Sequence, residues 1–268
     1  MANRREFILK EVPVAALGVA AALQSDSPAR ATEAEERPVA YFESQTYRLQ
    51  IGPEVGRLLG WLEKSALPIL QKSGAGPVGV FTVEVGPSNP AVLVLIHYSN
   101  LAQLEAAKFR LSESADWGTA LTELEAAGEP FYRLDSVLLR ATSFCPPLTS
   151  AVPGESGHKL FELRIYESPT QKQLGLLHEW FAGSVIDLFH LNGIHPVLYA
   201  DTVVGPNQPN MHYLVPFENE DQRQKAWTTF HGSPAFAKSR GEVVRRGAEI
   251  IRNTTNMLLV PAPFSMIR

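Results

Sequence analysis

The sequence predicts an α+β protein built from two copies of one β-α-β-β-α-β unit, and two observations lead to this expectation. The first is an internal repeat: adding 119 to a position between 41 and 100 gives 16 identities in 60 gapless pairs, where unrelated chains share about 6%. The identical pairs include Phe42 with Phe161, Trp61 with Trp180, and Gly74 with Gly193. The second is a hydrophobic period that switches between two and 3.6 residues in the same order in both halves.

Each unit opens with a strand and a helix. Residues 159–166 alternate between two faces: an apolar one with Phe161, Leu163 and Ile165, and a polar one with Glu162, Arg164 and Tyr166. Helical spacing follows, from Val55 to Ile69 in the first unit and from Leu174 to Leu188 in the second. Gly74 and Gly193 stand where a left-handed residue is expected to end these helices.

The second part of each unit reads as a hairpin, a helical region and a closing strand. Strands are expected at 78–85 and 91–98, joined by a turn rich in Gly, Pro and Asn. Helical regions follow at 101–127 and 220–247, broken near Ser114 and Ser233, and closing strands at 136–141 and 256–260. This order is the ferredoxin-like arrangement. The predicted units span 40–145 and 158–268, with a Pro-, Ser- and Gly-rich linker at 146–157.

The first 31 residues resemble a twin-arginine export signal. Residues 3–10 contain paired arginines followed by Phe, Ile, Leu and Lys, and a weakly apolar stretch leads to a small-x-small site at Ala29–Ala31. The alternative, an amphipathic N-terminal helix, lacks helical alternation of polar and apolar residues. We therefore expect a signal peptide over 1–31, a disordered lead-in over 32–39, and a periplasmic or secreted protein.

Composition narrows the classes of partner. The net charge is −4, or −5 without residues 1–31, and no basic stripe is present, which argues against nucleic acid and anionic membranes. After Leu23 no apolar run approaches the length of a membrane helix, so no membrane span is expected in the exported form. Cys145 is the single cysteine, which rules out an intrachain disulfide, and we expect it to be a small buried hydrophobe.

The strand openings carry a family resemblance. Tyr41-Phe42-Glu43 with Tyr47, the run 160–166, the Trp-containing helix that follows, and the turn after 82–86 resemble the NIPSNAP domain. The resemblance implies a dimeric α+β barrel, in which two ferredoxin-like sheets face each other with their helices outside. Here both halves would come from one chain. Gln45 stands where the family has an Arg, kept as Arg164 in the second copy, so a site that uses this Arg is expected in one repeat only.

The polar strand face supplies the candidate site. If helices cover the apolar face, Glu162, Arg164 and Tyr166 face the barrel interior, and an ion pair between the first two reduces the cost of burying them. Glu43 and Tyr47 occupy the equivalent places opposite, and His212 is the best inward-facing histidine. The alternative is a structural ion pair with aromatic fillers that specifies how the halves meet.

These observations predict an exported binding module without catalytic activity, holding a small apolar or amphipathic molecule or a protein partner and needing no cofactor. No catalytic residue is identified, and no recognised metal-ligand spacing is present. The alternative is a haem- or oxygen-dependent oxidoreductase of the monooxygenase kind, with His212 or His178 as the haem ligand. Exposed sheet edges or helix faces also allow a homodimer.

Overall fold

A computed structural model describes residues 39–268 of the protein, apart from residues 88, 127, 150–159 and 248. All of the described residues belong to one compact unit, Pro38–Arg268. The predicted signal peptide, nearly all of the predicted lead-in and most of the predicted linker lie outside the described residues.

In the described part of repeat 1 there are four strands and four α-helices, with one π-helical segment between the first two helices. In chain order they are β1 (Tyr41–Arg48), α1 (Glu54–Trp61), η1 (Leu62–Ala66), α2 (Leu67–Lys72), β2 (Val78–Val85), β3 (Ala91–Tyr98), α3 (Leu101–Ser112), α4 (Ala115–Glu125) and β4 (Arg133–Ala141).

Repeat 2 has the same elements in the same order. They are β5 (Leu160–Glu167), α5 (Gln171–Trp180), η2 (Phe181–Val185), α6 (Ile186–Leu191), β6 (Leu198–Val204), β7 (Asn210–Phe217), α7 (Glu220–Gly232), α8 (Pro234–Gly247) and β8 (Asn253–Pro261). The duplication and the β-α-β-β-α-β order are therefore confirmed.

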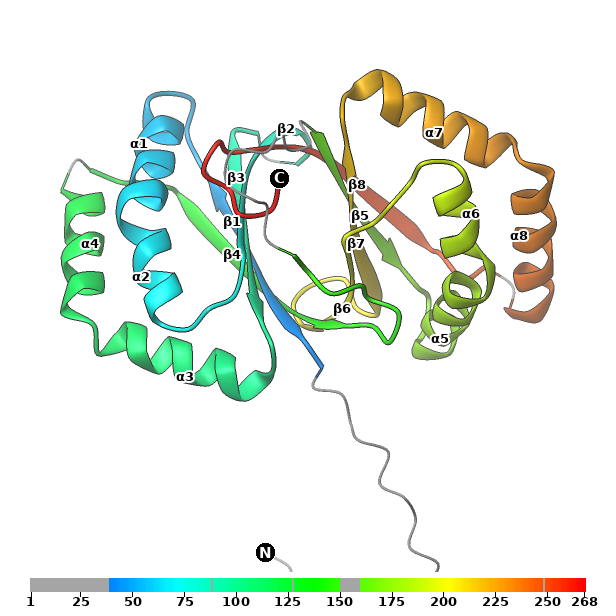
Figure 1. Ribbon diagram of the computed structural model, residues 1–268, viewed down its shortest axis with the longest axis horizontal. Coiled ribbons are helices and arrows are strands. Elements are labelled where there is room, and N and C mark those ends of the chain that lie inside the picture. Colours follow the sequence, from blue (N-terminus) through cyan, green and yellow to red (C-terminus); the bar gives the residue numbers. More distant parts are fainter. Residues whose placement is uncertain (1–38, 88, 127, 150–159, 248) are drawn as a thin grey trace, which may run out of the picture. The chain divides into compact units, whose positions relative to one another are not determined.

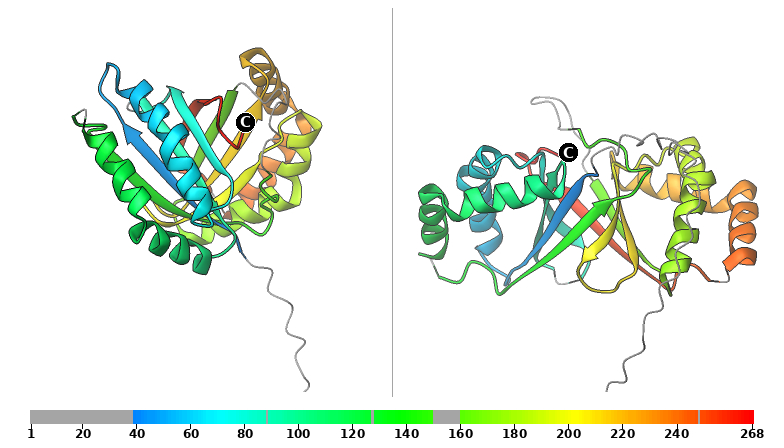
Figure 2. Two further views of the ribbon diagram at one scale, coloured as in Figure 1. Left: turned by 60° about the vertical axis from the view of Figure 1, so that its left-hand side comes forward. Right: turned by 90° about the horizontal axis from the view of Figure 1, so that it is seen from below.

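The eight strands form one closed, fully antiparallel barrel in the order β1-β3-β2-β8-β5-β7-β6-β4. Each repeat contributes a four-stranded sheet, and the two sheets are joined by the pairs β2–β8 and β4–β6. The helices of each repeat lie on the outer side of its own sheet (Figures 1 and 2). The predicted intrachain dimeric α+β barrel is thus confirmed.

Three apolar clusters result from this arrangement, because successive side chains of a strand point to opposite faces. One fills the barrel between the two sheets and includes Phe42, Phe81, Phe161 and Leu214. The other two lie between each sheet and its helices, one per repeat. Both faces of every sheet are therefore buried.

The predicted direction of the polar strand face was wrong. Phe161 and Leu163 belong to the cluster inside the barrel, with Ile165 packed against it. The ligand-binding set expected inside the barrel therefore points the other way: Glu162, Arg164 and Tyr166, and likewise Glu43 and Tyr47 of repeat 1, face the helices. The reason is that two apolar sheet faces pack on each other with no charge to satisfy, whereas the helices bring charged and polar partners to the polar face.

His212 does face the barrel interior, as predicted. It shares a face of β7 with Leu214, and its cross-strand neighbours Ile165 and Ala200 are interior residues. Gly74 and Gly193 also have the expected left-handed conformation, with φ of 91° and 72°.

The hairpin strands of repeat 1 match their predicted ranges, but both closing strands begin three residues earlier than predicted. Residues 133–135 and 253–255 lack apolar alternation, yet they pair with β1 and β5. An ion pair of 2.6 Å between Arg48 and Asp135 lies across the β1–β4 pair. Pairing with the neighbouring strand, and not the local sequence pattern, therefore decides where the closing strands begin.

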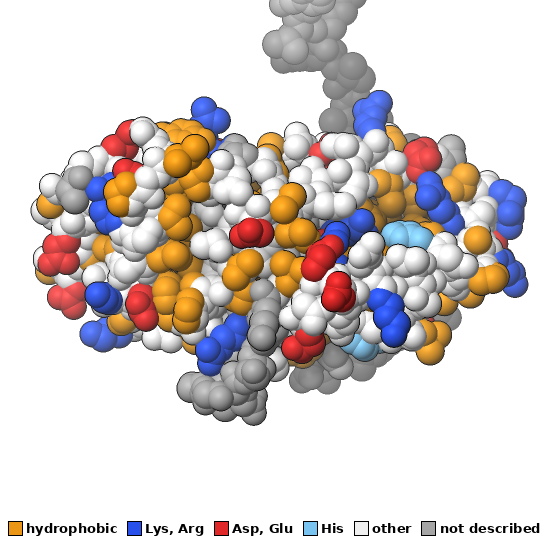
Figure 3. All heavy atoms as spheres, turned by 90° about the horizontal axis from the view of Figure 1, so that it is seen from above, with side chains coloured by type: hydrophobic (Ala, Val, Ile, Leu, Met, Phe, Trp, Pro, Cys, Tyr) orange, Lys and Arg blue, Asp and Glu red, His pale blue; other side chains and the backbone are white. Residues whose placement is uncertain are grey.

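The distribution of charged side chains on the surface agrees with a sequence that has no basic stripe. On the face shown in Figure 3, Lys and Arg side chains are interspersed with Asp and Glu side chains. Among the described residues, no helix has the length and hydrophobicity needed to cross a bilayer.

Candidate ligand-binding site

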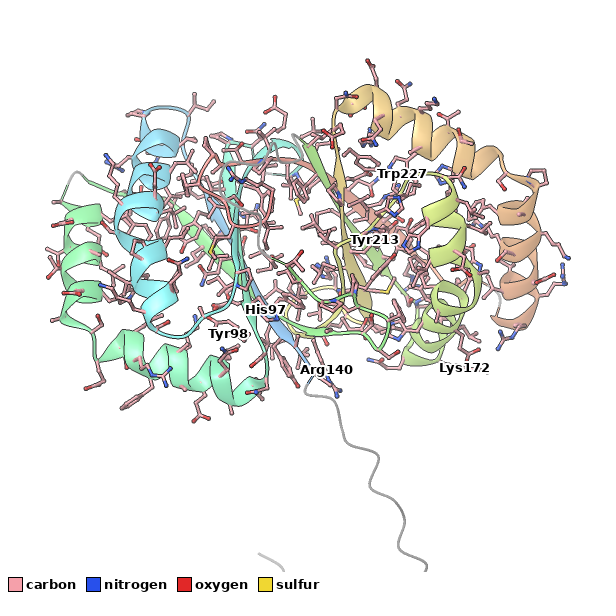
Figure 4. The ribbon with its side chains drawn as sticks, in the orientation of Figure 1. His97, Tyr98, Arg140, Lys172, Tyr213 and Trp227 are labelled. Atoms are coloured by element: carbon pink, nitrogen blue, oxygen red, sulfur yellow. The ribbon has the colours of Figure 1, made fainter. Side chains whose placement is uncertain are left out.

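A pocket of about 440 Å³ lies between the sheet of repeat 2 and its helices. Its walls are largely aromatic: Tyr166, Trp180, Phe181, Phe189, Phe230 and Phe236. The polar part of the lining consists of Arg164, His231, Arg240, Thr254, Asn256 and one acidic residue, Glu249, which lies 4.0 Å from Arg240. Figure 4 shows two residues beside this pocket, Tyr213 on β7 and Trp227 on α7, between the strands and the helices.

The π-helical segment η2 shapes one wall of this pocket. Its signature is the hydrogen bond from the Ile186 amide to the Phe181 carbonyl, five residues back. Both ends of the segment, Phe181 and Val185, line the pocket. Short π segments inside α-helices occur frequently at functional sites. The equivalent segment η1 in repeat 1 shows that this irregularity belongs to the domain itself.

Arg164 lies at the base of the pocket, where groups from four elements, β5, β7, β8 and α7, surround its guanidinium. Its Nε donates to Asn256 Oδ1 at 3.1 Å and lies 3.2 Å from Glu162 Oε1. Its Nη1 lies 3.3 Å from the hydroxyl oxygens of both Tyr166 and Tyr213. The guanidinium also lies over the Trp227 ring, 4.2 Å from the centroid, a favourable cation–π distance.

Glu162 is fully buried and has two cationic neighbours. Its Oε2 accepts hydrogen bonds from Arg223 Nε at 2.8 Å and from Trp227 Nε1 at 2.6 Å. Oε1 has no hydrogen-bond partner among the described residues, and the nearby Arg164 charge offsets part of the cost of burying the carboxylate. Glu162 therefore orients both Arg164 and α7.

The protonation states of the pocket follow from burial and from Arg164. Burial alone would lower the pKa of Arg164, but Tyr213, Tyr166 and Glu162 outweigh it, so its pKa is raised and the side chain stays charged. Burial raises the pKa of Tyr213 well above its usual value. Burial, with Arg164 nearby, lowers the pKa of His231, which favours a neutral imidazole at pH 7.

Repeat 1 contains the equivalent pocket in a smaller form, about 180 Å³. Gln45 takes the place of Arg164 and Tyr47 that of Tyr166. The Gln45 amide donates to Glu43 Oε1 at 2.9 Å, and the Tyr47 hydroxyl donates to Gln45 Oε1 at 2.9 Å. Lys108, which replaces Trp227, forms an ion pair of 2.6 Å with Glu43. The polar groups of this pocket are therefore engaged with one another.

His212 and His178, the two histidines considered as haem ligands, do not line either of these pockets. Thr202 donates its hydroxyl proton to Asn210, so the His212 Nε2, 3.0 Å from the same oxygen, must donate to it. His178 Nε2 lies 2.9 Å from Asp201 Oδ1. The Nε2 of each ring therefore has a protein partner.

His190 and His195, on either side of Gly193, lie with stacked rings whose centroids are 5.0 Å apart. Among the described residues, no group of three or more His, Cys, Asp or Glu side chains is placed to hold a metal ion.

From the sequence, Trp180 was noted only as the repeat partner of Trp61, and no pattern pointed to Arg223, Trp227 or Phe230. The last three occur at i, i+4 and i+7, a spacing that places them on one helix face. An arginine on the same helix face as two aromatic residues is the sequence signal that could have predicted a contact between α7 and a buried carboxylate.

Comparison with known sequences and structures gives the family of this fold. The NIPSNAP family profile matches residues 42–146 and 161–266. No curated protein matches the chain.

Several solved structures are similar to this one. A provisionally assigned monooxygenase from Fusobacterium nucleatum has a TM-score of 0.55 at 8% identity, covering 83% of this chain and 92% of the other. An anthrone oxidase-like protein has a TM-score of 0.50 at 12% identity, covering 85% and 92%. A NIPSNAP domain protein from Burkholderia xenovorans is 23% identical over 40% of this chain and 99% of its own, with a TM-score of 0.35. The family profile covers most of both repeats, and the chain therefore belongs to the NIPSNAP family, with two copies of the domain in tandem.

Proposed function

We propose that this protein binds a small amphipathic molecule in the pocket between the sheet and the helices of repeat 2. The observation that carries this proposal is the aromatic pocket of about 440 Å³ with Arg164 at its base. Small-molecule sites are typically concave spaces of about 300–1,000 Å³, mostly apolar, with a few polar groups that fix orientation.

The barrel interior supports this location by contrast. It is filled by side chains from both repeats, and its ring contacts include an edge-to-face pair, Phe81 and Phe161, with centroids 5.1 Å apart. Ligand binding there would require displacing packed side chains. The helix-side pocket needs no such rearrangement.

The resemblance of residues 3–10 to a twin-arginine box supports the further proposal that binding takes place in the periplasm or outside the cell. The twin-arginine route carries proteins that are already folded, which suits a chain whose two repeats must close into one barrel.

The test uses 1-anilinonaphthalene-8-sulfonate, an aromatic anion whose fluorescence rises in apolar surroundings. Thr254 is an exposed residue of the pocket lining on β8, and Leu134 lines the repeat 1 pocket. Thr254→Trp should block the repeat 2 pocket and weaken dye binding at least about tenfold, or ~1.4 kcal/mol. The matched variant Leu134→Trp should leave dye affinity unchanged. Equal dye affinity in the two variants would reject this location.

A second candidate function is oxygen-dependent oxidation of the bound molecule. The observation that favours it is the grouping of a charged Arg164 with the Tyr166 hydroxyl in the pocket lining, because such donors stabilise an oxyanion. Oxygen uptake by the full chain with anthrone as the probe separates the two functions. Uptake that Arg164→Gln abolishes supports oxidation, and tight binding without uptake supports a binding protein.

A further inference from the structure

The hydrogen-bond directions at the base of the repeat 2 pocket determine which kind of ligand head group fits there. The Tyr213 hydroxyl donates to the Tyr166 oxygen at 2.7 Å, and Arg164 Nη1 also points at that oxygen, at 3.3 Å. The Tyr166 oxygen therefore receives two hydrogen bonds. Its own proton is left to point elsewhere, and Tyr166 lines the pocket.

Arg164 likewise has hydrogen-bond donors that no group in the described part of the chain accepts. Its Nε and Nη1 are used by Asn256 and the two tyrosines, whereas the structure gives its Nη2 no hydrogen-bond partner among the described residues. Arginine carries five N–H donors and no acceptor. Two donors thus remain for a ligand, on a guanidinium held in place by Glu162 and the Trp227 ring.

From this geometry we infer that the repeat 2 pocket selects planar aromatic molecules that carry an oxyanion, with carboxylate as the simplest head group. The base of the pocket offers the Tyr166 hydroxyl proton and the Arg164 Nη2 protons, all donors, so it matches a group that only accepts. The aromatic walls match a flat apolar body. This inference rests on the proposed function and names the ligand class for that site.

Charge balance supports an anion over a neutral acceptor. Glu162 is shared between Arg164 and Arg223, while Glu220, which also pairs with Arg223, is more than half exposed. Arg223 therefore has a second carboxylate partner, whereas Arg164 has only its share of Glu162 within the part of the chain that the structure describes. A ligand carboxylate would complete the pairing, and charge-assisted hydrogen bonds are stronger than neutral ones.

The experiment compares three probes that share one ring system: 2-naphthoate, 2-methylnaphthalene and 2-naphthylmethylammonium. Binding to the full chain is followed by quenching of tryptophan fluorescence, since Trp180 lines the pocket. We expect 2-naphthoate to bind about ten- to a hundredfold tighter than 2-methylnaphthalene, the range given by hydrogen bonds to charged groups. The ammonium probe should bind weakest.

Variants assign the preference to named groups. Arg164→Gln gives repeat 2 the residue of repeat 1 and should remove the preference for naphthoate while keeping binding of 2-methylnaphthalene. Tyr166→Phe keeps the ring and leaves the Glu162 pairs intact, so it remains informative if Arg164→Gln folds poorly. It should reduce the preference in part. The matched variant Tyr47→Phe in repeat 1 should leave it unchanged.

Each outcome has a distinct meaning. If 2-methylnaphthalene binds as tightly as 2-naphthoate, or if neither Arg164→Gln nor Tyr166→Phe changes their ratio, the ligand class is wrong while the pocket proposal stands. If none of the three probes binds, the proposed function fails and the ligand class fails with it.

Discussion

The pockets between the sheet and the helices of the two repeats share one backbone arrangement but are lined by different side chains. In both, a π segment and a Tyr two residues after the strand position of Gln45 or Arg164 line the pocket. In repeat 1, Lys108 of α3 supplies the cation for Glu43, and Gln45 completes a closed set of hydrogen bonds. In repeat 2, Glu162 has a helix cation, Arg223 of α7, and a second cation on the strand itself, Arg164, while Trp227 takes the place of the lysine.

This difference shows how few substitutions convert a packed layer into a site with available donors. The added positive charge on the strand, Arg164, lines the pocket, whereas the helix cation Arg223 does not. The barrel needs both sheets, but it does not need both pockets to be alike. Under the proposed function, repeat 1 serves mainly as structure while repeat 2 binds the ligand.

The largest expected effect comes from removing the buried carboxylate of repeat 2. Glu162→Gln leaves Arg164 and Arg223 without their shared anion, and breaking a buried ion pair costs about 3–5 kcal/mol. The equivalent change in repeat 1, Glu43→Gln, should cost about 1 kcal/mol or less, because the Lys108 side chain is 43% exposed and can be hydrated. Urea unfolding of both variants measures the contrast. Equal losses would show that the two polar clusters are energetically alike.

The second largest expected effect is the loss of stability at acidic pH that is caused by His212. Burial lowers the pKa of His212 to about 4, below the ordinary value of 6.5 that applies in the unfolded chain. The unfolded state therefore binds the additional proton first, so stability falls as the pH drops from about 6.5 to about 4, by roughly 3 kcal/mol in total. Repeat 1 has Leu93 at this position, and His212→Leu should remove that part of the acid sensitivity.

Denaturation at pH 7 and pH 4.5 provides the measurement for His212. Replacing a surface histidine instead, as in His190→Gln, should leave the acid response nearly as it is in the wild type. An acid response unchanged in His212→Leu would mean that other groups cause it.

The smallest effect should be the same in both repeats. Asn100 accepts a hydrogen bond from the Gln103 amide at 2.8 Å, and Asn219 accepts one from the Gln222 amide at 2.9 Å, so both cap the helix that follows. Asn100→Ala and Asn219→Ala should each lower the free energy of unfolding by about 1 kcal/mol. Thermal melts of the two variants should nearly coincide. Clearly unequal shifts would show that α3 and α7 differ in how strongly they are held.

Much of the fold could be predicted from the sequence because its signals are local and occur twice. The +119 repeat, the switch of hydrophobic period and the glycines after the first helices specify the elements and their order. The residues of the candidate site were also identifiable, since the alternation in 159–166 separates Glu162, Arg164 and Tyr166 from their apolar neighbours. The direction of that face was predicted wrongly.

The sequence by itself determined the duplication, the alternation and the single arginine that distinguishes repeat 2. Only the tertiary structure decided which sheet face meets the other repeat, because both faces are buried and alternation gives no sign of what covers them. It also decided that α7 brings Arg223 and Trp227 to Glu162, contacts 61 and 65 residues apart in sequence. Such partners are chosen by packing across the whole domain, which no local pattern records.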